Sequence, residues 1–394
     1  MVWRGGELAQ SRFTPAAIAV THLFSVGFMS MVMIGALQQM LPVLAGAPIR
    51  QPRLAAGITH ICLTLGTLGL AGGLLFDQTA LLKTGVIGLG CGFMVLLIAV
   101  GLALLHARTR GAAVNAIWIA VLSLLATVTM GAILGSSLGW GIPLLAALLV
   151  DLHPGWGLLG WTGLLATGIA FHAIPMLQST PAYPAWMVRW FVPLAFVLLL
   201  TWSVASALPP HTGQTGRTAC QVALASMYVA FAAVTIDLLQ RRRRRLPDVS
   251  VDFWRVGMAS LLAANIVWLA GIVAPVDWRV SVDLSIGVLA FFGFAGSIIN
   301  GMLYKIVPFL AWFHGQARAG AGKAVPNMRV LLGQERQRLQ FRIHLVTLAL
   351  LVCASAWQPQ FVLPAGLALG LDATLLAINV LGVASAFEAL GAPA

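Results

Sequence analysis

Charged residues are scarce in this sequence. Only 9% of its 394 residues are Asp, Glu, Lys or Arg, whereas 60% are hydrophobic. Several apolar runs are longer than the roughly 18 residues that a helix needs to cross a hydrocarbon core. A soluble protein would leave such runs unexplained, so the composition indicates an all-α, multi-pass membrane protein.

Motifs built on cysteine are also absent. Cys62, Cys91, Cys220 and Cys353 lie in separate apolar runs, and none belongs to a CxxC pair. We therefore expect small buried thiols and no disulfide framework. The first 14 residues lack an Ala-x-Ala cleavage pattern, and we expect no removable signal peptide.

The sequence lacks the patterns of most soluble enzymes. It has no nucleotide-binding loop, no serine or cysteine triad and no paired carboxylates, and its aqueous loops are too short for a separate catalytic domain. Whether the protein is an enzyme stays open at this point, and no catalytic residue is assigned. Any chemistry is expected to take place inside the membrane.

Basic residues give the chain a net charge of +12 and are unevenly distributed. We predict eleven spans, at residues 15–44, 54–76, 81–106, 112–139, 154–178, 187–208, 218–240, 253–275, 281–311, 342–357 and 361–389. The loops after odd-numbered spans hold most of the arginines, including the Arg241–Arg245 run. By the positive-inside rule, the N-terminus lies outside and the C-terminus lies in the cytoplasm of a bacterial-type inner (plasma) membrane. The arginine run is then a topology anchor beside anionic lipid, and nucleic acid is not an expected partner.

A pattern of two glycines and a proline occurs three times. It comprises Gly27, Gly35 and Pro42; Gly160, Gly168 and Pro175; and Gly293, Gly301 and Pro308, with 133 residues between successive sets. A fixed interval indicates a repeated structural unit, and this one can hold about four membrane helices. We therefore predict that the single transmembrane domain, residues 1–394, consists of three pseudo-threefold arcs at 15–139, 154–275 and 281–389, the last one helix short. The glycines are expected to permit close approach of neighbouring helices.

Five ionisable residues are the candidate functional groups: His22, His60, His153, His172 and Asp372. Such residues are costly at membrane depth. Imidazole is a common ligand of haem iron, copper and zinc, and we take His22, His60 and His172 as candidate metal ligands and His22 with His153 as candidate cofactor ligands. Because no HxxxH or HxH pair is present, any site must be assembled between helices. His22 lies 20 residues before Pro42, whereas His153 lies 22 residues before Pro175. This difference of two residues is about 200° around a helix, so the two histidines are predicted to face different pores.

Plainer interpretations of these residues stay open. A lone histidine in a span also serves as a hydrogen-bonding packing residue, and Lys305 can snorkel to the interface. Met29 and Met33 suit Cu(I) but equally suit apolar packing. Asp372, near the middle of the last span, should be protonated or paired if it is buried. Four further histidines are predicted at span ends or in loops, where solvation explains them: His106, His211, His314 and His344.

The stretch from residue 21 to residue 54 carries a longer pattern. It contains Thr21-His22, Gly27-Phe28, Gly35, Leu41-Pro42 and Ala45-Gly46-Ala47-Pro48. This stretch resembles the second helix of subunit I of the haem–copper oxidase superfamily and the loop that follows it. His153-Pro154 is similar to the start of that family's copper-site helix. Lys305-Ile306-Val307-Pro308-Phe309 is similar to the end of the helix that carries two haem-binding histidines.

The resemblance implies twelve helices in three four-helix arcs, with the first helix missing from this chain. It also implies haem b or copper as cofactors, with His22 as the primary ligand, and respiratory or oxidase-assembly proteins as partners. The chain departs from the family in its third repeat, where Ile286 and Val288 replace the expected histidines. Too few histidines lie in the spans for a complete oxygen-reducing oxidase.

These residues leave three functions open. The first is a divergent oxidase-like protein that binds haem b or copper and senses, transfers or detoxifies, for example in nitric oxide handling. The second is a metal-free transporter or channel on the same scaffold, with Asp372 as the intramembrane charge. The third is a metal-free assembly partner of a respiratory complex.

Overall fold

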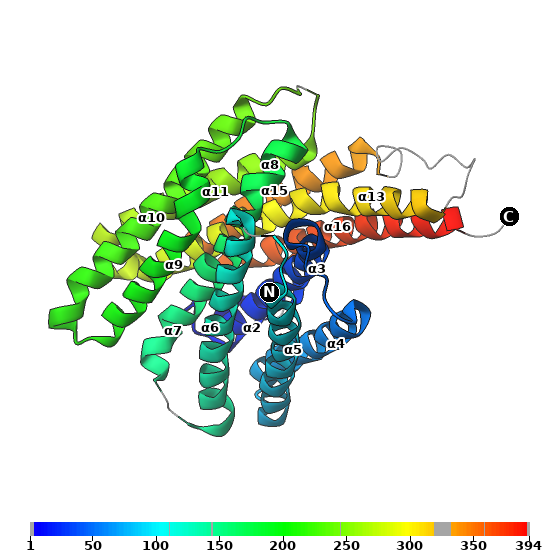
Figure 1. Ribbon diagram of the computed structural model, residues 1–394. Coiled ribbons are helices and arrows are strands. Elements are labelled where there is room, and N and C mark those ends of the chain that lie inside the picture. The colour runs from blue at the N-terminus through cyan, green and yellow to red at the C-terminus, as the bar shows by residue number, and fades with distance from the viewer. Residues whose placement is uncertain are drawn as a thin grey trace. The chain divides into compact units, whose positions relative to one another are not determined.

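The computed structural model describes residues 4–109, 111–142, 145–244, 246–318, 332–357 and 359–391, and the regular structure in these ranges is entirely helical. In this part of the chain, eleven helices are long and apolar enough to cross a membrane. Figure 1 shows the helices with their labels. The predicted all-α, multi-pass character is therefore confirmed. A short helix, α1 (Gly5–Leu8), precedes the first span.

The spans consist of one or more helical segments each. In chain order they are α2 (Pro15–Phe24), η1 (Ser25–Ser30) and α3 (Met31–Ala45); α4 (Pro52–Leu75); α5 (Thr79–Leu105); α6 (Ala112–Trp140); α7 (Ala146–Gly155), η2 (Trp156–Leu164) and α8 (Leu165–Gln178); α9 (Ala185–Ala207); α10 (Pro210–Gln240); α11 (Val249–Val273); α12 (Arg279–Val288), η4 (Leu289–Gly296) and α13 (Ser297–Arg318); α15 (Gln334–Trp357); and α16 (Val362–Gly391). Single-turn 3-10 helices, η3 (Val276–Trp278) and η5 (Pro359–Phe361), lead into α12 and α16.

The loop predicted at residues 314–341 is shorter than expected. Helix α13 continues to Arg318, and α15 begins at Gln334. The tenth span therefore starts eight residues before the predicted residue 342, and this difference places His344 well inside a helix. Residues 319–331 of this loop lie outside the described part of the chain.

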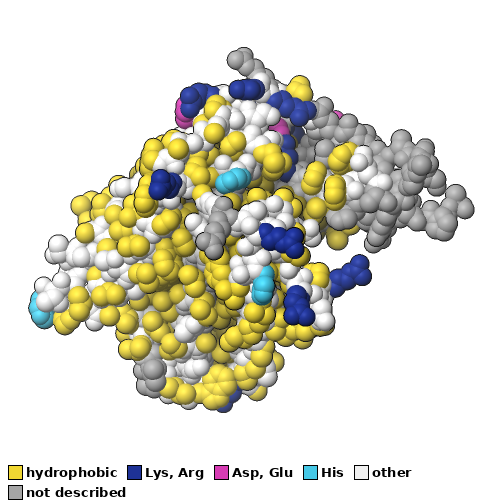
Figure 2. Space-filling view, in the orientation of Figure 1, with side chains coloured by type: hydrophobic (Ala, Val, Ile, Leu, Met, Phe, Trp, Pro, Cys, Tyr) yellow, Lys and Arg dark blue, Asp and Glu magenta, His cyan; other side chains and the backbone are white. Residues whose placement is uncertain are grey.

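Hydrophobic side chains cover most of the face shown in Figure 2. Leu65, Ile98 and Val204 each expose more than half of their surface. Apolar patches of this extent are unfavourable in water, whereas hydrocarbon tails solvate them well. The exposed faces of these helices are therefore those expected to face lipid.

Two compact units make up the chain. The N-terminal unit comprises Phe13–Arg243, and the C-terminal unit comprises Met1–Arg12 with Arg244–Ala394. Close backbone approach is a feature of the N-terminal unit. An added Cβ at Gly66 of α4 would lie 2.6 Å from the Leu89 backbone nitrogen, and one at Gly85 of α5 would lie 2.2 Å from that of Leu70. Only glycine permits this separation of α4 and α5.

The three glycine–proline helices share an unusual local structure. Each contains a π-helical segment, namely η1, η2 or η4, and these segments hold Gly27, Gly160 and Gly293. The π-helix is rare, and short π-helical segments occur frequently at functional sites. Three such segments at one position of the repeat show that the sequence pattern repeats in the backbone as well.

The second and third repeats also pack in the same way. The contacts are Gly160 with Ser123, Gly168 with Ala116, Gly293 with Ser260, and Gly301 with Phe253. At each of these glycines an added Cβ would lie 2.3–2.9 Å from the Cβ of its partner. The partners belong to α6 and α11, the last helices of the predicted first and second arcs. These four glycines thus permit close helix approach, as predicted. The prediction is wrong for the first repeat, where an added Cβ would lie 3.6 Å from Cγ2 of Thr67 at Gly27 and would meet nothing within 4 Å at Gly35. The rotation that relates the three arcs stays a prediction, since the third repeat belongs to the other unit.

Candidate functional site

His22 of α2 and His153 of α7 lie next to each other in the N-terminal unit. Their ring centroids are 6.0 Å apart, and the ring planes are inclined by only 13°. Each histidine lies seven residues after the first residue of its span, or about 10 Å along the helix. The prediction that they face different pores is wrong. It assumed an uninterrupted α-helix between each histidine and its proline, whereas η1 and η2 change the register in between.

Backbone carbonyls fix the orientation of both rings. The Nδ1 atom of His22 is 2.8 Å from the Ile18 carbonyl oxygen, and that of His153 is 3.0 Å from the Thr127 carbonyl oxygen. A carbonyl only accepts hydrogen bonds, so a neutral ring carries its proton on Nδ1 and a lone pair on Nε2. Neither Nε2 atom makes a hydrogen bond within the described part of the chain. Metal-binding histidines are commonly held in this way.

A glycine of α6 makes room for the His153 ring. An added Cβ at Gly131 would lie 2.9 Å from Cε1 of His153. Both histidines are half-buried. Both rings are thus partly exposed, and each is held by a backbone carbonyl.

The donor set of this site is small. Within the described ranges, no group of three or more His, Cys, Asp or Glu side chains could hold a metal ion. His60 of α4 and His172 of α8 are exposed, and neither makes a hydrogen bond or ring contact with another described side chain. A structural zinc site requires four ligands, so two imidazoles alone do not fit it. Imidazole nitrogen is also a ligand of copper and of haem iron.

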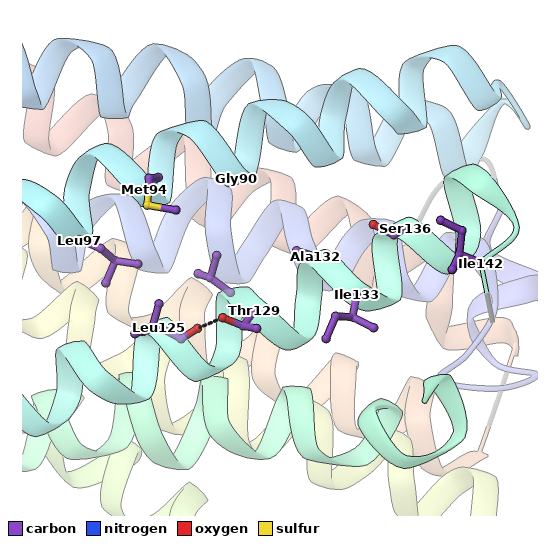
Figure 3. A pocket seen from close by; sticks show the side chains of 10 residues that line it. Gly90, Met94, Leu97, Leu125, Thr129, Ala132, Ile133, Ser136 and Ile142 are labelled. Atoms are coloured by element: carbon purple, nitrogen blue, oxygen red, sulfur yellow. Dashed lines mark hydrogen bonds between the residues drawn. The ribbon is translucent and has the colours of Figure 1, made fainter. Parts of the chain in front are cut away.

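A groove between α5 and α6 is a separate feature of the N-terminal unit (Figure 3). It encloses about 460 Å³ and is lined by Met94, Leu125, Thr129 and Ile142, among others. The Thr129 hydroxyl donates to the Leu125 carbonyl of its own helix at 2.8 Å. No ionisable side chain lines the groove, so it suits an acyl chain and is not part of the histidine site.

A second polar cluster occupies the interior of the C-terminal unit. His344 of α15 is fully buried, and Asp372 of α16 is only 3% exposed. The Nδ1 atom of His344 is 3.1 Å from Oδ2 of Asp372, and its Nε2 atom is 2.8 Å from Oγ of Ser297 on α13. The expectation that a buried Asp372 would be paired is confirmed. The prediction that His344 is solvated at a span end is wrong, because α15 begins eight residues earlier than expected.

Hydrogen bonds extend the cluster away from the His344–Asp372 pair. Gln340 donates from Nε2 to Oδ1 of Asp372 at 2.8 Å and accepts at Oε1 from the Tyr304 hydroxyl at 3.1 Å. Asn379 donates to the Tyr304 hydroxyl at 2.9 Å. All of these side chains are buried. We call the group of Ser297, Asn300, Tyr304, Gln340, His344, Asp372 and Asn379 the polar cluster.

Phenylalanines enclose the imidazole of His344. The Phe292 ring of η4 lies 4.4 Å from it in a stacked arrangement, and the Phe253 ring of α11 meets it edge-on at 5.1 Å. Lys305, which the sequence allows to snorkel, pairs with Asp248 at the N-terminal end of α11. The sequence contains one signal for this cluster, since Gln340 and His344 are four residues apart, as are Asn300 and Tyr304, and such pairs share a helix face.

No protein-family model matches the chain, and no curated protein matches it. The fold and the two polar sites therefore define a class: a multi-pass helical membrane protein with a facing histidine pair in one unit and a buried histidine–aspartate cluster in the other.

Proposed function

We propose that this protein is a divergent relative of haem–copper oxidase subunit I that binds copper or haem b through His22 and His153. The observation that carries the proposal is the pairing of two parallel imidazoles, 6.0 Å apart, from helices far apart in sequence. The same two residues carry the sequence resemblance. Their Nδ1 atoms are both engaged by backbone carbonyls, so both Nε2 lone pairs are available to a metal.

His22 and His153 would hold copper or haem iron through their Nε2 atoms, since their Nδ1 atoms are engaged by carbonyl oxygens. The bond from His153 to the Thr127 carbonyl of α6 is also the bond that a packing histidine makes to a neighbouring helix, so metal analysis decides between the two roles.

Bound copper or haem iron would supply one-electron redox chemistry. The residues of the chain would hold and orient this group and limit its exposure to water. The third repeat lacks histidines at the expected positions, so we propose electron transfer, sensing or detoxification rather than oxygen reduction. The proposed setting is a bacterial-type inner membrane with the N-terminus outside, beside respiratory or oxidase-assembly proteins.

Metal analysis and the optical spectrum of the purified protein test this proposal. Protein produced with haem and copper supplied should contain one of the two, and His22→Ala and His153→Ala should each lose it. His106→Ala is a matched control, because His106 makes the same bond from Nδ1 to a carbonyl four residues earlier, at 2.8 Å, but is exposed. Full metal content in both variants would refute the site. Metal-free wild-type protein would favour the transporter, channel or assembly-partner functions.

A further inference from the structure

The polar cluster of the C-terminal unit has the properties of a proton-binding site. Its only ionisable members are His344, Asp372 and Tyr304, and they come from α13, α15 and α16. We propose that the His344–Asp372 pair takes up and releases one proton as the protein functions. This proposal is independent of metal binding at His22 and His153.

The protonated state of the pair is neutral in total. One proton lies between Nδ1 of His344 and Oδ2 of Asp372, which are 3.1 Å apart, and a second lies on Nε2 and is donated to the Ser297 hydroxyl oxygen at 2.8 Å. An imidazolium beside a carboxylate and a neutral imidazole beside a carboxylic acid are two forms of this one state. A buried pair of this kind is tolerated because no net charge remains.

Ser297 allows the pair to lose a proton without losing a hydrogen bond. When the Nε2 proton leaves, Nε2 becomes an acceptor, and the serine hydroxyl can rotate and donate to it. Nδ1–H still donates to Asp372, and Gln340 still donates to the other carboxylate oxygen at 2.8 Å. Both protonation states are therefore fully hydrogen-bonded around the two titrating groups, as expected of a site that alternates between them.

Asn300 provides a second adjustable group. Its Nδ2 lies 3.4 Å from Nδ1 of His344, and its Oδ1 is buried without a partner among the described residues. Rotation of the amide by half a turn brings Oδ1 toward Nδ1, where it can accept from Nδ1–H. Because Nδ1 stays protonated in both states of the pair, this second orientation of the amide suits both of them.

The remaining hydrogen bonds do not form a proton wire. A wire requires groups that both accept and donate protons, as hydroxyl, imidazole and carboxyl groups do. Gln340 stands between Asp372 and Tyr304, and an amide does not readily pass a proton on. The exchanging proton therefore leaves the pair at Nε2 and passes to a water molecule that reaches this side of the imidazole, beside Ser297, the first residue after the π-helical segment η4.

The charged groups on the surrounding elements are already satisfied or exposed. From α11 and η4, only Phe253 and Phe292 face the imidazole. Among the described side chains of the packed helices, three groups of ion pairs occur: Lys305 with Asp248; Arg338 and Arg255 with Asp252; and Asp283 with Arg12. Arg279 of α12 is exposed. Glu335, Arg336 and Arg342 of α15 are exposed. Protonation of the pair is thus determined mainly within the cluster.

Nitrogen-15 NMR of the histidine-labelled, full-length protein in lipid vesicles tests the proposal directly. His344→Gln identifies the His344 signals by their disappearance. Over the pH range in which the protein stays folded, wild-type His344 should change reversibly between a form protonated on both nitrogens and a form protonated on Nδ1 alone. A single unchanging form of His344 over this range would overturn the proposal.

Variants separate proton binding from simple packing. Asp372→Asn should abolish the doubly protonated form, because a buried imidazolium is then uncompensated. Ser297→Ala should reduce that form at a fixed pH, whereas Ser285→Ala, which removes another buried serine bonded to Ser355 at 2.8 Å, should leave it unchanged. Equal effects of the two serine variants would refute the role of Ser297. If the His344 signals change with sodium concentration at constant pH, the cluster binds a cation and the proton-binding proposal is wrong.

Discussion

Gly168 offers the sharpest test of the repeated packing. An added Cβ at this position would lie 2.3 Å from the Cβ of Ala116, well inside van der Waals contact, and neither atom is the end of a flexible side chain. Gly168→Ala must therefore separate α8 from α6. Overpacking of this kind costs about 1–3 kcal/mol, while alanine in place of glycine gains up to about 1 kcal/mol in helix propensity. We expect a net loss of up to about 2 kcal/mol of unfolding free energy.

Gly90→Ala is the matched control for this change. Gly90 lies within α5, and an added Cβ would meet nothing within 4 Å, so this variant should be neutral or slightly stabilised. Unfolding by a denaturing detergent, followed by circular dichroism in mild-detergent micelles, measures the difference between the two variants. If Gly168→Ala is as stable as Gly90→Ala, the close approach of α6 and α8 is incorrect.

Three further predictions concern other parts of the chain. Asp372→Ala should lower the unfolding free energy by about 3 kcal/mol, because it leaves His344 buried without its partner. In the same unfolding assay, the double variant Asp372→Asn with His344→Gln should restore part of that loss. A cysteine in place of Arg243, in a cysteine-free background, should resist a membrane-impermeant thiol reagent added from outside, and efficient labelling would reverse the predicted topology. Burial raises the pKa of Tyr183, which lies between two spans and bonds to Thr235 at 2.8 Å. The stability that its protonated hydroxyl contributes is therefore present below about pH 10 and is lost as the pH rises further. In a thermal-unfolding series, Tyr183→Phe should lose less stability at alkaline pH than the wild-type protein.

The general architecture was accessible from the sequence because membrane helices are defined by local composition. A span needs only length and hydrophobicity, and eight of the eleven predicted spans agree with the observed ones within five residues at both ends. The fifth, seventh and tenth spans each begin eight residues earlier than predicted. The pairing of His22 with His153 was not accessible. Both were candidates, but their relative direction depends on π-helical segments, and a register counted at 3.6 residues per turn fails across such a segment.

His344 was missed for a different reason. It follows Arg336, Arg338 and Arg342 closely, so the start of the tenth span resembles an interface. The structure extends α15 to Gln334, and Arg338 pairs with Asp252, which satisfies a charge that seemed to require water. The partner Asp372 lies 28 residues further along the chain, and nothing local indicates that the two meet. Tertiary pairing of polar groups is the information that single-sequence patterns lack.

Pulsed electron paramagnetic resonance of the oxidised wild-type protein tests the central claim most directly. If His22 and His153 bind copper or haem iron together, the spectrum should show nitrogen couplings from two imidazoles on one metal centre per chain. His153→Ala should leave couplings from at most one imidazole, and His106→Ala should leave both. A wild-type protein that binds neither haem nor copper when both are supplied, or a metal centre whose couplings are unchanged in His153→Ala, would contradict the account.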